Sequence, residues 1–126
     1  MTPWGSLVRQ YRAAKNISLK QMADGVGLSP SYLSAIELGS KGHPKTALVE
    51  KTIKFLRLTQ PQQAKLRLAA ERSNQIVKIP NDSSPETYHL VHLMAERVSN
   101  LSAREVQVIA FLLDEDKYNN GGCYEY

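Results

Sequence analysis

Hydroxyl-bearing side chains are concentrated in one short segment of this chain, just after Ser29 and Pro30. Ser31, Tyr32 and Ser34 are close neighbours there. Each hydroxyl can donate one hydrogen bond and accept others, and the tyrosine adds an apolar ring. A helix that turned these groups outward would present a small, polar and aromatic face, which could form hydrogen bonds to a polar polymer.

The pair Ser29 and Pro30 is typical of a helix start. A serine before the first helical residue accepts a hydrogen bond from a free backbone N–H, and a proline at the first position has no N–H to leave unsatisfied. The helix predicted from Pro30 to Glu37 turns Leu33 and Ile36 inward, because these two residues are three apart. The positions left outward or at the flank are Ser31, Tyr32, Ser34 and Ala35.

A second helix is predicted immediately before this one, from Leu19 to Val26. Ser18 and Gln21 match the S-x-x-Q capping box that begins a helix. Gly27 can adopt the positive φ that a tight turn requires, and the small Ala23 allows the next helix to approach closely. Two helices crossed in this way present the later helix outward, and such a helix fits the major groove of DNA. The pattern predicts a helix-turn-helix.

The rest of the chain has helix starts and apolar residues three or four apart, which predicts an all-α protein. We expect five helices in a domain of residues 1–78, a linker at 79–84, a helical hairpin at 85–114 and a disordered tail at 115–126. The fifth helix should reach about Val77 and hold Ile76 inward. The predicted helices run over about 5–15, 19–26, 30–37, 45–58, 61–77, 85–99 and 102–113.

Charge divides the chain into a basic and an acidic part. Residues 1–78 have 13 Lys and Arg against 4 Asp and Glu, a net charge of +9. Residues 79–126 have 3 against 8, a net charge of −5. A basic half of this kind favours an anionic polymer as partner, whereas the acidic half must serve another purpose.

Phosphate contacts are expected where free backbone N–H groups at helix starts meet neighbouring polar and cationic side chains. These are the starts of the second and third helices and the loop that follows the third. Such contacts set the register of a protein on DNA without reading its sequence. The candidate phosphate-binding residues are Ser18, Lys20, Gln21, Ser29, Lys41, His43 and Lys45.

From Val8 to Leu58 the chain resembles the Cro/cI-type helix-turn-helix domain (lambda-repressor-like, XRE) of phage and bacterial transcriptional regulators. The most specific features are the run SYLSAIE at Ser31 to Glu37 and the later Pro44. The resemblance implies a five-helix DNA-binding domain whose third helix reads bases. It also implies dimers on palindromic double-stranded operators, and a repressor is the regulator we expect.

At two positions the chain differs from this family, so the DNA contacts that other members make there cannot be assumed for this chain. Many members have glutamine where this chain has Leu19, and several have a long polar residue where it has Pro30. Base reading is therefore expected at Ser31, Tyr32 and Ser34, with Ala35 able to meet a thymine methyl group.

No enzyme, cofactor or metal site is expected. His89, His92 and Glu96 have a spacing that a metal site could use, but they lie opposite the apolar residues of their helix and indicate a solvated face. Cys123 has no neighbouring histidine to activate it, and a single cysteine suits a reducing compartment. Without a signal pattern or a long apolar run, we expect a cytoplasmic, nucleoid-associated protein of bacterial or phage origin, with no membrane contact.

The predicted seventh helix is apolar nearly all round, so it needs burial on several sides. Dimerisation would provide this burial, and packing onto residues 1–78 is the alternative. A third interpretation is an antitoxin that binds a toxin through its C-terminal half while autoregulating its operon. The candidate dimer-interface residues are Leu90, Met94, Val106, Ile109, Phe111, Leu112 and Leu113.

Overall fold

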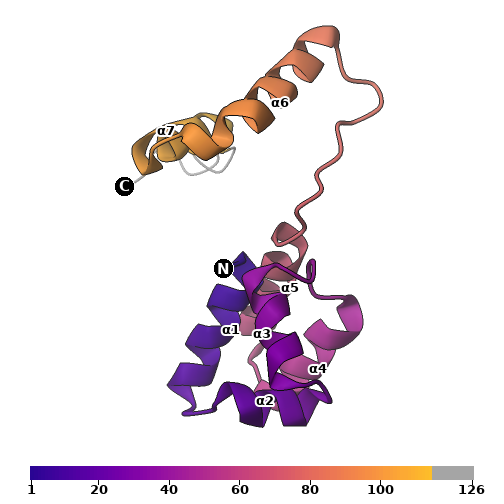
Figure 1. The fold of residues 1–126 in the computed structure, drawn as a ribbon, viewed down its shortest axis with the longest axis vertical. Helices are drawn as coiled ribbons and strands as arrows, with labels where there is room; N and C mark the ends of the chain where they lie inside the picture. The colour runs from indigo at the N-terminus through magenta and orange to yellow at the C-terminus, as the bar shows by residue number, and fades with distance from the viewer. Residues whose placement is uncertain (115–126) are drawn as a thin grey trace. The chain divides into compact units, whose positions relative to one another are not determined.

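The computed structural model describes residues 1–114 of the chain, and within that range it contains helices and no strand (Figure 1). The all-α prediction is therefore confirmed. The chain divides into two compact units, which we call unit 1 (Met1–Val77) and unit 2 (Lys78–Tyr126). The disorder predicted for residues 115–126 lies outside the described residues.

Within residues 1–114, unit 1 contains five helices and unit 2 contains two helices joined by a short 3-10 turn. No helix in residues 1–114 is long and apolar enough to cross a membrane. The elements of unit 1 are α1 (Pro3–Ala14), α2 (Leu19–Val26), α3 (Pro30–Leu38), α4 (Thr46–Leu56) and α5 (Gln60–Arg72). The elements of unit 2 are α6 (Pro85–Arg97), η1 (Val98–Asn100) and α7 (Ala103–Leu113).

Helix starts follow the predicted capping signals. At α2 the backbone N–H of Gln21 donates to Ser18 Oγ at 3.1 Å, and the N–H of Ser18 donates to Gln21 Oε1 at 2.8 Å. The same reciprocal pair forms at the starts of α5 and α7. At α3 Ser29 Oγ accepts from the N–H of Tyr32 at 3.2 Å. Each cap satisfies donors that a helix start would otherwise leave without partners.

The hydrophobic core lies where all five helices of unit 1 meet. Its most completely buried large side chains are Trp4, Met22, Leu33, Leu56 and Leu66, one from each helix. Burial of such side chains supplies most of the free energy of folding. A core shared by every helix makes unit 1 a single cooperative structure.

The first helix begins earlier than predicted, at Pro3 instead of about Gly5. Thr2 caps it, because the N–H of Gly5 donates to Thr2 Oγ1 at 3.0 Å. Threonine followed by proline is the same start signal as Ser29 and Pro30, so the start of α1 at Pro3 could have been predicted from the sequence. The earlier start carries Trp4 into the core, where none of its surface is exposed.

The fifth helix ends sooner than predicted, at Arg72, and the expectation that Ile76 points inward is wrong. Ser73 Oγ donates to the carbonyl of Ala69 at 2.7 Å and accepts from the N–H of Trp4 at 3.0 Å. The chain after Ser73 is no longer helical, so helical spacing cannot turn Ile76 toward the core. Its side chain is 75% exposed.

Candidate nucleic-acid interface

Helices α2 and α3 are joined by the tight turn that the sequence predicts. Gly27 has φ 77°, in the left-handed region where glycine is favoured. Both Gly27 and Leu28 donate their N–H groups to the carbonyl of Ala23, which closes the end of α2. Ala23 and Leu33 are fully buried, so α3 is held across α2 by its apolar side. The opposite side of α3 is left at the surface.

The four predicted base-reading residues all lie at the surface of α3. Ser31 and Tyr32 are exposed, the tyrosine by 45%, whereas Ser34 and Ala35 are half-buried. The Ser31 hydroxyl is 3.4 Å from that of Ser29. Three hydroxyl groups and a methyl group therefore share one short stretch of helix near its start. This surface can form hydrogen bonds without moving the core residues behind it.

The predicted phosphate-binding residues lie in three places: the start of α2, the start of α3 and the α3–α4 loop. All are exposed except His43, which is half-buried. The side-chain oxygen of Gln21 is used in its cap, but its amide NH₂ remains able to donate. The serine caps likewise use an acceptor and leave a hydroxyl proton. Caps and anion contacts are therefore compatible at these helix starts.

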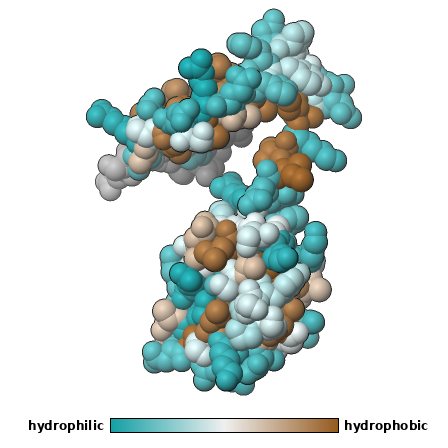
Figure 2. Space-filling view, viewed as in Figure 1, coloured by the Kyte–Doolittle hydropathy of each residue, from teal (hydrophilic) through white to brown (hydrophobic). Residues whose placement is uncertain are grey.

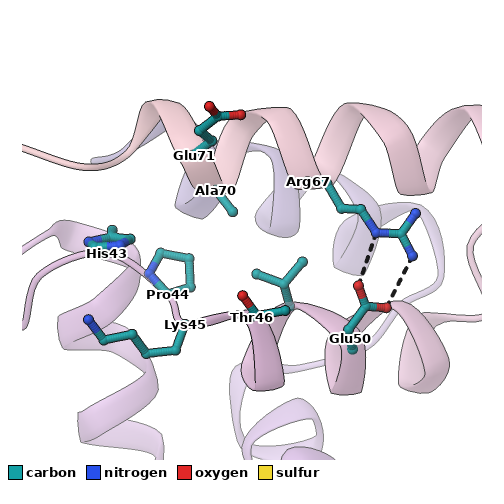
Figure 3. A pocket seen from close by; sticks show the side chains of 9 residues that line it. His43, Pro44, Lys45, Thr46, Glu50, Arg67, Ala70 and Glu71 are labelled. Atoms are coloured by element: carbon teal, nitrogen blue, oxygen red, sulfur yellow. Dashed lines mark hydrogen bonds and ion pairs between the residues drawn. The ribbon is translucent and has the colours of Figure 1, made fainter. Parts of the chain in front are cut away.

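The α3–α4 loop also borders a cavity of about 370 Å³ between the start of α4 and α5 (Figure 3). His43 and Lys45 lie on the loop side of this cavity. On the other side Arg67 forms two hydrogen bonds to the Glu50 carboxylate, from Nε at 3.0 Å and from a terminal nitrogen at 3.1 Å. These bonds from Arg67 lower the pKa of Glu50. The Glu50 carboxylate is neutralised by its own partner, and Glu71 adds a second carboxylate to the lining near the loop cations.

Comparison with known proteins identifies the segment that contains this surface. A family model described as helix-turn-helix matches residues 8–61. Residues 8–61 are a helix-turn-helix domain. The resemblance drawn from the sequence is thereby confirmed, and α2 and α3 are the two helices joined by the turn of this domain.

Three curated relatives are transcriptional regulators of Bacillus, and none is named as an enzyme. The helix-turn-helix domain is 34% identical over 58 residues to the uncharacterized HTH-type transcriptional regulator RghRB of Bacillus subtilis (strain 168), covering 46% of this chain and 42% of that protein. The HTH-type transcriptional regulator SinR of Bacillus subtilis (strain 168) and that of Bacillus licheniformis are each 38% identical over 47 residues. These matches cover 37% of this chain and 42% of each SinR. The chain thus spans about two fifths of each relative.

The helix-turn-helix domain also contains a buried ion pair that the sequence analysis missed. Arg12 donates to both carboxylate oxygens of Glu37 from one terminal nitrogen, at 3.0 and 3.1 Å. Glu37 is 1% exposed and Arg12 is 8% exposed. Arg9 lies 3.7 Å from the same carboxylate at the surface. The two partners are 25 residues apart, so no local spacing indicates the pair.

The end of α3 is fixed to α1 by a second set of bonds. The carbonyl of Glu37 accepts from both the N–H and the hydroxyl of Thr2, at 3.1 and 2.9 Å. The Gln75 side chain donates to the carbonyl of Gly39 at 3.2 Å. Together with the ion pair, these bonds hold α3 to the residues before α1 and after α5. These bonds fix the orientation of α3, and with it the direction in which Ser31 and Tyr32 are presented at the surface.

Burial raises the pKa of Glu37 above its ordinary value, and the charges of Arg12 and Arg9 offset this only in part. We therefore predict a specific pH dependence of stability. Between about pH 4.5, where the unfolded carboxyl titrates, and the raised folded pKa, the folded state binds more protons than the unfolded state. The contribution of Glu37 to the free energy of unfolding falls as pH rises through this window.

Denaturant unfolding of the full chain and of Glu37→Gln across pH 4 to 8 measures this effect. The difference in unfolding free energy, parent minus Glu37→Gln, should decrease with rising pH and then level off. A difference that grows with pH would show that the arginines outweigh burial.

The histidines and the glutamate that the sequence singles out on α6 are not gathered into a metal site within the described residues. His89 and His92 are exposed on α6, as is Glu96. No group of three potential metal ligands occurs within residues 1–114. Cys123 lies outside the described residues.

Proposed function

We propose that the chain is a dimeric transcriptional repressor that binds a palindromic double-stranded DNA operator through α3. The observation that carries this proposal is the surface formed by the exposed Ser31 and Tyr32 and the half-buried Ser34, on a helix held in the helix-turn-helix arrangement. The relatives are transcriptional regulators by name, which supports the same class of function. Basic residues around this surface suit a polyanion.

In this proposal the exposed side of α3 enters the major groove. Ser31 and Ser34 form hydrogen bonds to base edges, and Tyr32 contacts a thymine methyl group or a phosphate. Ala35 contacts a methyl group. Because these side chains are short, base reading depends on a close approach of the helix itself. The N–H groups at the starts of α2 and α3 and the α3–α4 loop then bind phosphates on both sides.

The proposed dimer forms through unit 2, where apolar side chains remain at the surface. A two-fold axis relates two copies of the helix-turn-helix domain, as a palindrome requires, with the α3 helices about 34 Å apart. The interface residues are Leu90, Met94, Val106, Ile109, Phe111, Leu112 and Leu113. Dimerisation also raises operator affinity, because the second half-site is bound intramolecularly.

Replacing base-reading and phosphate-binding residues should have different effects. Tyr32→Ala and Ser34→Ala should each reduce discrimination between operator and random DNA by about 1–3 kcal/mol per lost base contact. Lys45→Ala should weaken binding to both DNAs alike and reduce the slope of log affinity against log salt by about 1. Gel shifts on its own promoter and on a random duplex, over a series of salt concentrations, measure both effects.

Lys51→Ala is the matched control for this experiment, because Lys51 is an exposed lysine on α4 outside the proposed contacts. It should leave both affinities within about twofold, as a lysine that neutralises no phosphate does. If affinity for the operator were independent of salt, phosphate neutralisation would be excluded as the main source of binding. If all four variants weakened both DNAs equally, the assignment of base-reading residues would be wrong.

The antitoxin interpretation is the second candidate, and the exposed apolar residues of unit 2 favour keeping it. Copurification of the tagged full chain from its own cells tests it. A stoichiometric, small basic protein in the eluate would support a toxin partner. A homodimer alone would support the repressor.

A further inference from the structure

The end of α3 is bonded to residues that lie far away in the sequence. Gly39 takes the left-handed φ of 92° that ends the helix. Its carbonyl accepts from Gln75 Nε2 at 3.2 Å, over a separation of 36 residues. The carbonyl of Glu37 accepts from Thr2, over a separation of 35 residues. Both distant partners lie outside residues 8–61, the segment that the family model matches, so the last turn of α3 depends on chain beyond that segment.

The chain that leaves α5 is attached to unit 1 by two side chains in succession. Ser73 is 3% exposed, and its hydroxyl accepts from the N–H of Trp4 at 3.0 Å. Two residues later Gln75 lies so close to Gly39 that a Cβ atom on the glycine would be 3.0 Å from Gln75 Nε2. We call these two bonded pairs, Ser73–Trp4 and Gln75–Gly39, the clasp. The clasp fastens the chain after α5 to the end of α3 as well as to α1.

Beyond the clasp the chain is unattached. In the described part of the chain, Val77, Lys78 and Ile79 form no hydrogen bond. Ile76 and Val77 are 75% and 85% exposed, and hydrophobic atoms are visible along the segment that follows α5 (Figure 2). Gln75 is therefore where the hydrogen bonds between this stretch and the helix-turn-helix domain stop.

The direction of α3 is sensitive to how its end is attached. At about 1.5 Å per residue, its nine residues span about 13 Å. A tilt of about 5° about the end of a helix of this length moves its start by about 1 Å. Groups that recognise a ligand must be held within about 0.5 Å of their working positions. Ser31 and Tyr32 lie at the start of α3, so its attachment at Gly39 affects whether they meet base edges.

We propose that Gln75 is a positioning residue for DNA recognition: its bond to Gly39 holds α3 at the tilt at which Ser31 and Tyr32 reach base edges. Gln75 itself touches no DNA. This inference rests on the function proposed above, to which it adds a residue outside α2 and α3 on which discrimination between operator and random DNA depends. Because such coupling is reciprocal, a bound operator in turn holds the clasp closed.

The exposed position of Gln75 makes this role separable from a role in folding. One neutral hydrogen bond contributes little to the stability of a domain. Arg12 and Glu37, which also hold α3, are buried, so their replacement disturbs the core. A change at Gln75 that alters DNA recognition without altering stability therefore acts through the position of α3.

Gln75→Ala in the full chain should weaken binding to a duplex from its own promoter about three- to tenfold, as loss of one hydrogen bond does, and leave binding to a random duplex within about twofold. Gln63→Ala is the matched control, because Gln63 Nε2 donates to the carbonyl of Leu58 at 3.0 Å and this bond does not involve α3. It should leave both affinities within about twofold. Fluorescence anisotropy measures binding, and urea unfolding should show similar, small losses of stability in the two variants.

Two further replacements separate the hydrogen bond from the bulk of the side chain. Gln75→Lys keeps a donor, whereas Gln75→Glu keeps the shape of glutamine but has no donor when ionised. Discrimination is the ratio of the affinities for the two duplexes, so an added charge that acts on both largely cancels. This ratio should return to within about twofold of the parent in Gln75→Lys and stay reduced in Gln75→Glu. Equal ratios in the two variants would overturn the role of the bond.

Hydrogen exchange followed by NMR tests the reciprocal effect. The N–H of Ile76 donates to the side-chain oxygen of Asn74 at 3.0 Å, in the turn centred on Gln75. The promoter duplex should slow exchange of this N–H at least about twofold more than the random duplex does, and the difference should vanish in Gln75→Ala. Equal slowing by the two duplexes would contradict the coupling.

The outcomes separate this inference from the proposed function. If the parent chain did not distinguish its promoter from random DNA, the regulator proposal would be contradicted. If the parent distinguished them and Gln75→Ala did so equally well, only the positioning role of Gln75 would be overturned. Loss of discrimination in Gln63→Ala as large as in Gln75→Ala would indicate a general loosening of unit 1, which also overturns this role.

Discussion

Replacing Arg12 by alanine is expected to lower the free energy of unfolding of unit 1 by about 3–5 kcal/mol. The reason is the Glu37 carboxylate, which is 1% exposed and receives two hydrogen bonds from Arg12. Without Arg12, the carboxylate must either remain charged without its buried partner or bind a proton. Urea unfolding of the full chain at neutral pH measures the loss.

Two further variants separate the pair from the charges around it. Arg9→Ala removes a cation that is 58% exposed and 3.7 Å from the same carboxylate, so it should cost at most about 1 kcal/mol. Arg12→Met with Glu37→Leu removes both buried charges and should be much less destabilising than Arg12→Ala alone. If the double variant were the least stable of the three, the pair would be a net source of stability instead of a means of orienting α3.

The second large effect is expected at Gly5, where α1 lies directly against the backbone of Glu37 in α3. A Cβ atom at this position would lie 2.2 Å from the carbonyl oxygen of Glu37 and 2.8 Å from its carbonyl carbon. Both neighbours are backbone atoms, so rotation of a side chain cannot relieve the overlap. We expect Gly5→Ala to destabilise unit 1 by about 2–3 kcal/mol, despite the better helix propensity of alanine.

Gly25 provides a matched control. It also lies inside a helix, and a Cβ atom there would lie 2.2 Å from the Phe55 ring. Phe55 is half-buried, so its side chain can rotate away. Gly25→Ala should therefore change stability by no more than about 1 kcal/mol. Thermal unfolding of both variants at equal concentration makes the comparison. If both variants lost the same amount of stability, the backbone contact between Gly5 and Glu37 would not be the cause of the effect at Gly5.

The Gly5 variant also has an expected effect on function, since the overlapping atoms belong to the end of α3. An α3 helix moved away from α1 would shift Ser31 and Tyr32 relative to the proposed phosphate-binding residues of α2. Specific binding should then be lost before non-specific binding, because phosphate contacts tolerate displacement better than base contacts.

Local signals in the sequence predicted the helix starts and the exposed side of α3 well. Ser18 with Gln21, and Ser29 with Pro30, begin helices through groups that lie within four residues of one another. The serine oxygen accepts a hydrogen bond from a free backbone N–H, and Pro30 has no N–H to satisfy. Gly27 adopts the predicted positive φ, and Leu33 faces the core. The exposure of Ser31 and Tyr32 follows from the same spacing. The roles of these two residues in reading DNA stay predictions.

The features that could not be predicted depend on contacts between distant residues. The Arg12–Glu37 pair joins α1 to α3, and Ser73, the residue after α5, accepts a hydrogen bond from the N–H of Trp4. Sequence spacing indicates which side of a helix is apolar, but not which polar residue of another helix lies opposite. Ile76 was misplaced because helical spacing was extended beyond Arg72, where α5 ends.

The burial of Trp4 has a practical consequence for spectroscopy. It is the only tryptophan of the chain, none of its surface is exposed, and its ring N–H has no hydrogen-bond partner. Its emission should therefore be blue-shifted in the native protein and move to longer wavelength only when unit 1 unfolds. Far-ultraviolet circular dichroism, by contrast, detects α6 and α7 as well. Two optical signals recorded on one unlabelled sample can thus separate the melting of the helix-turn-helix domain from the melting of the C-terminal helices.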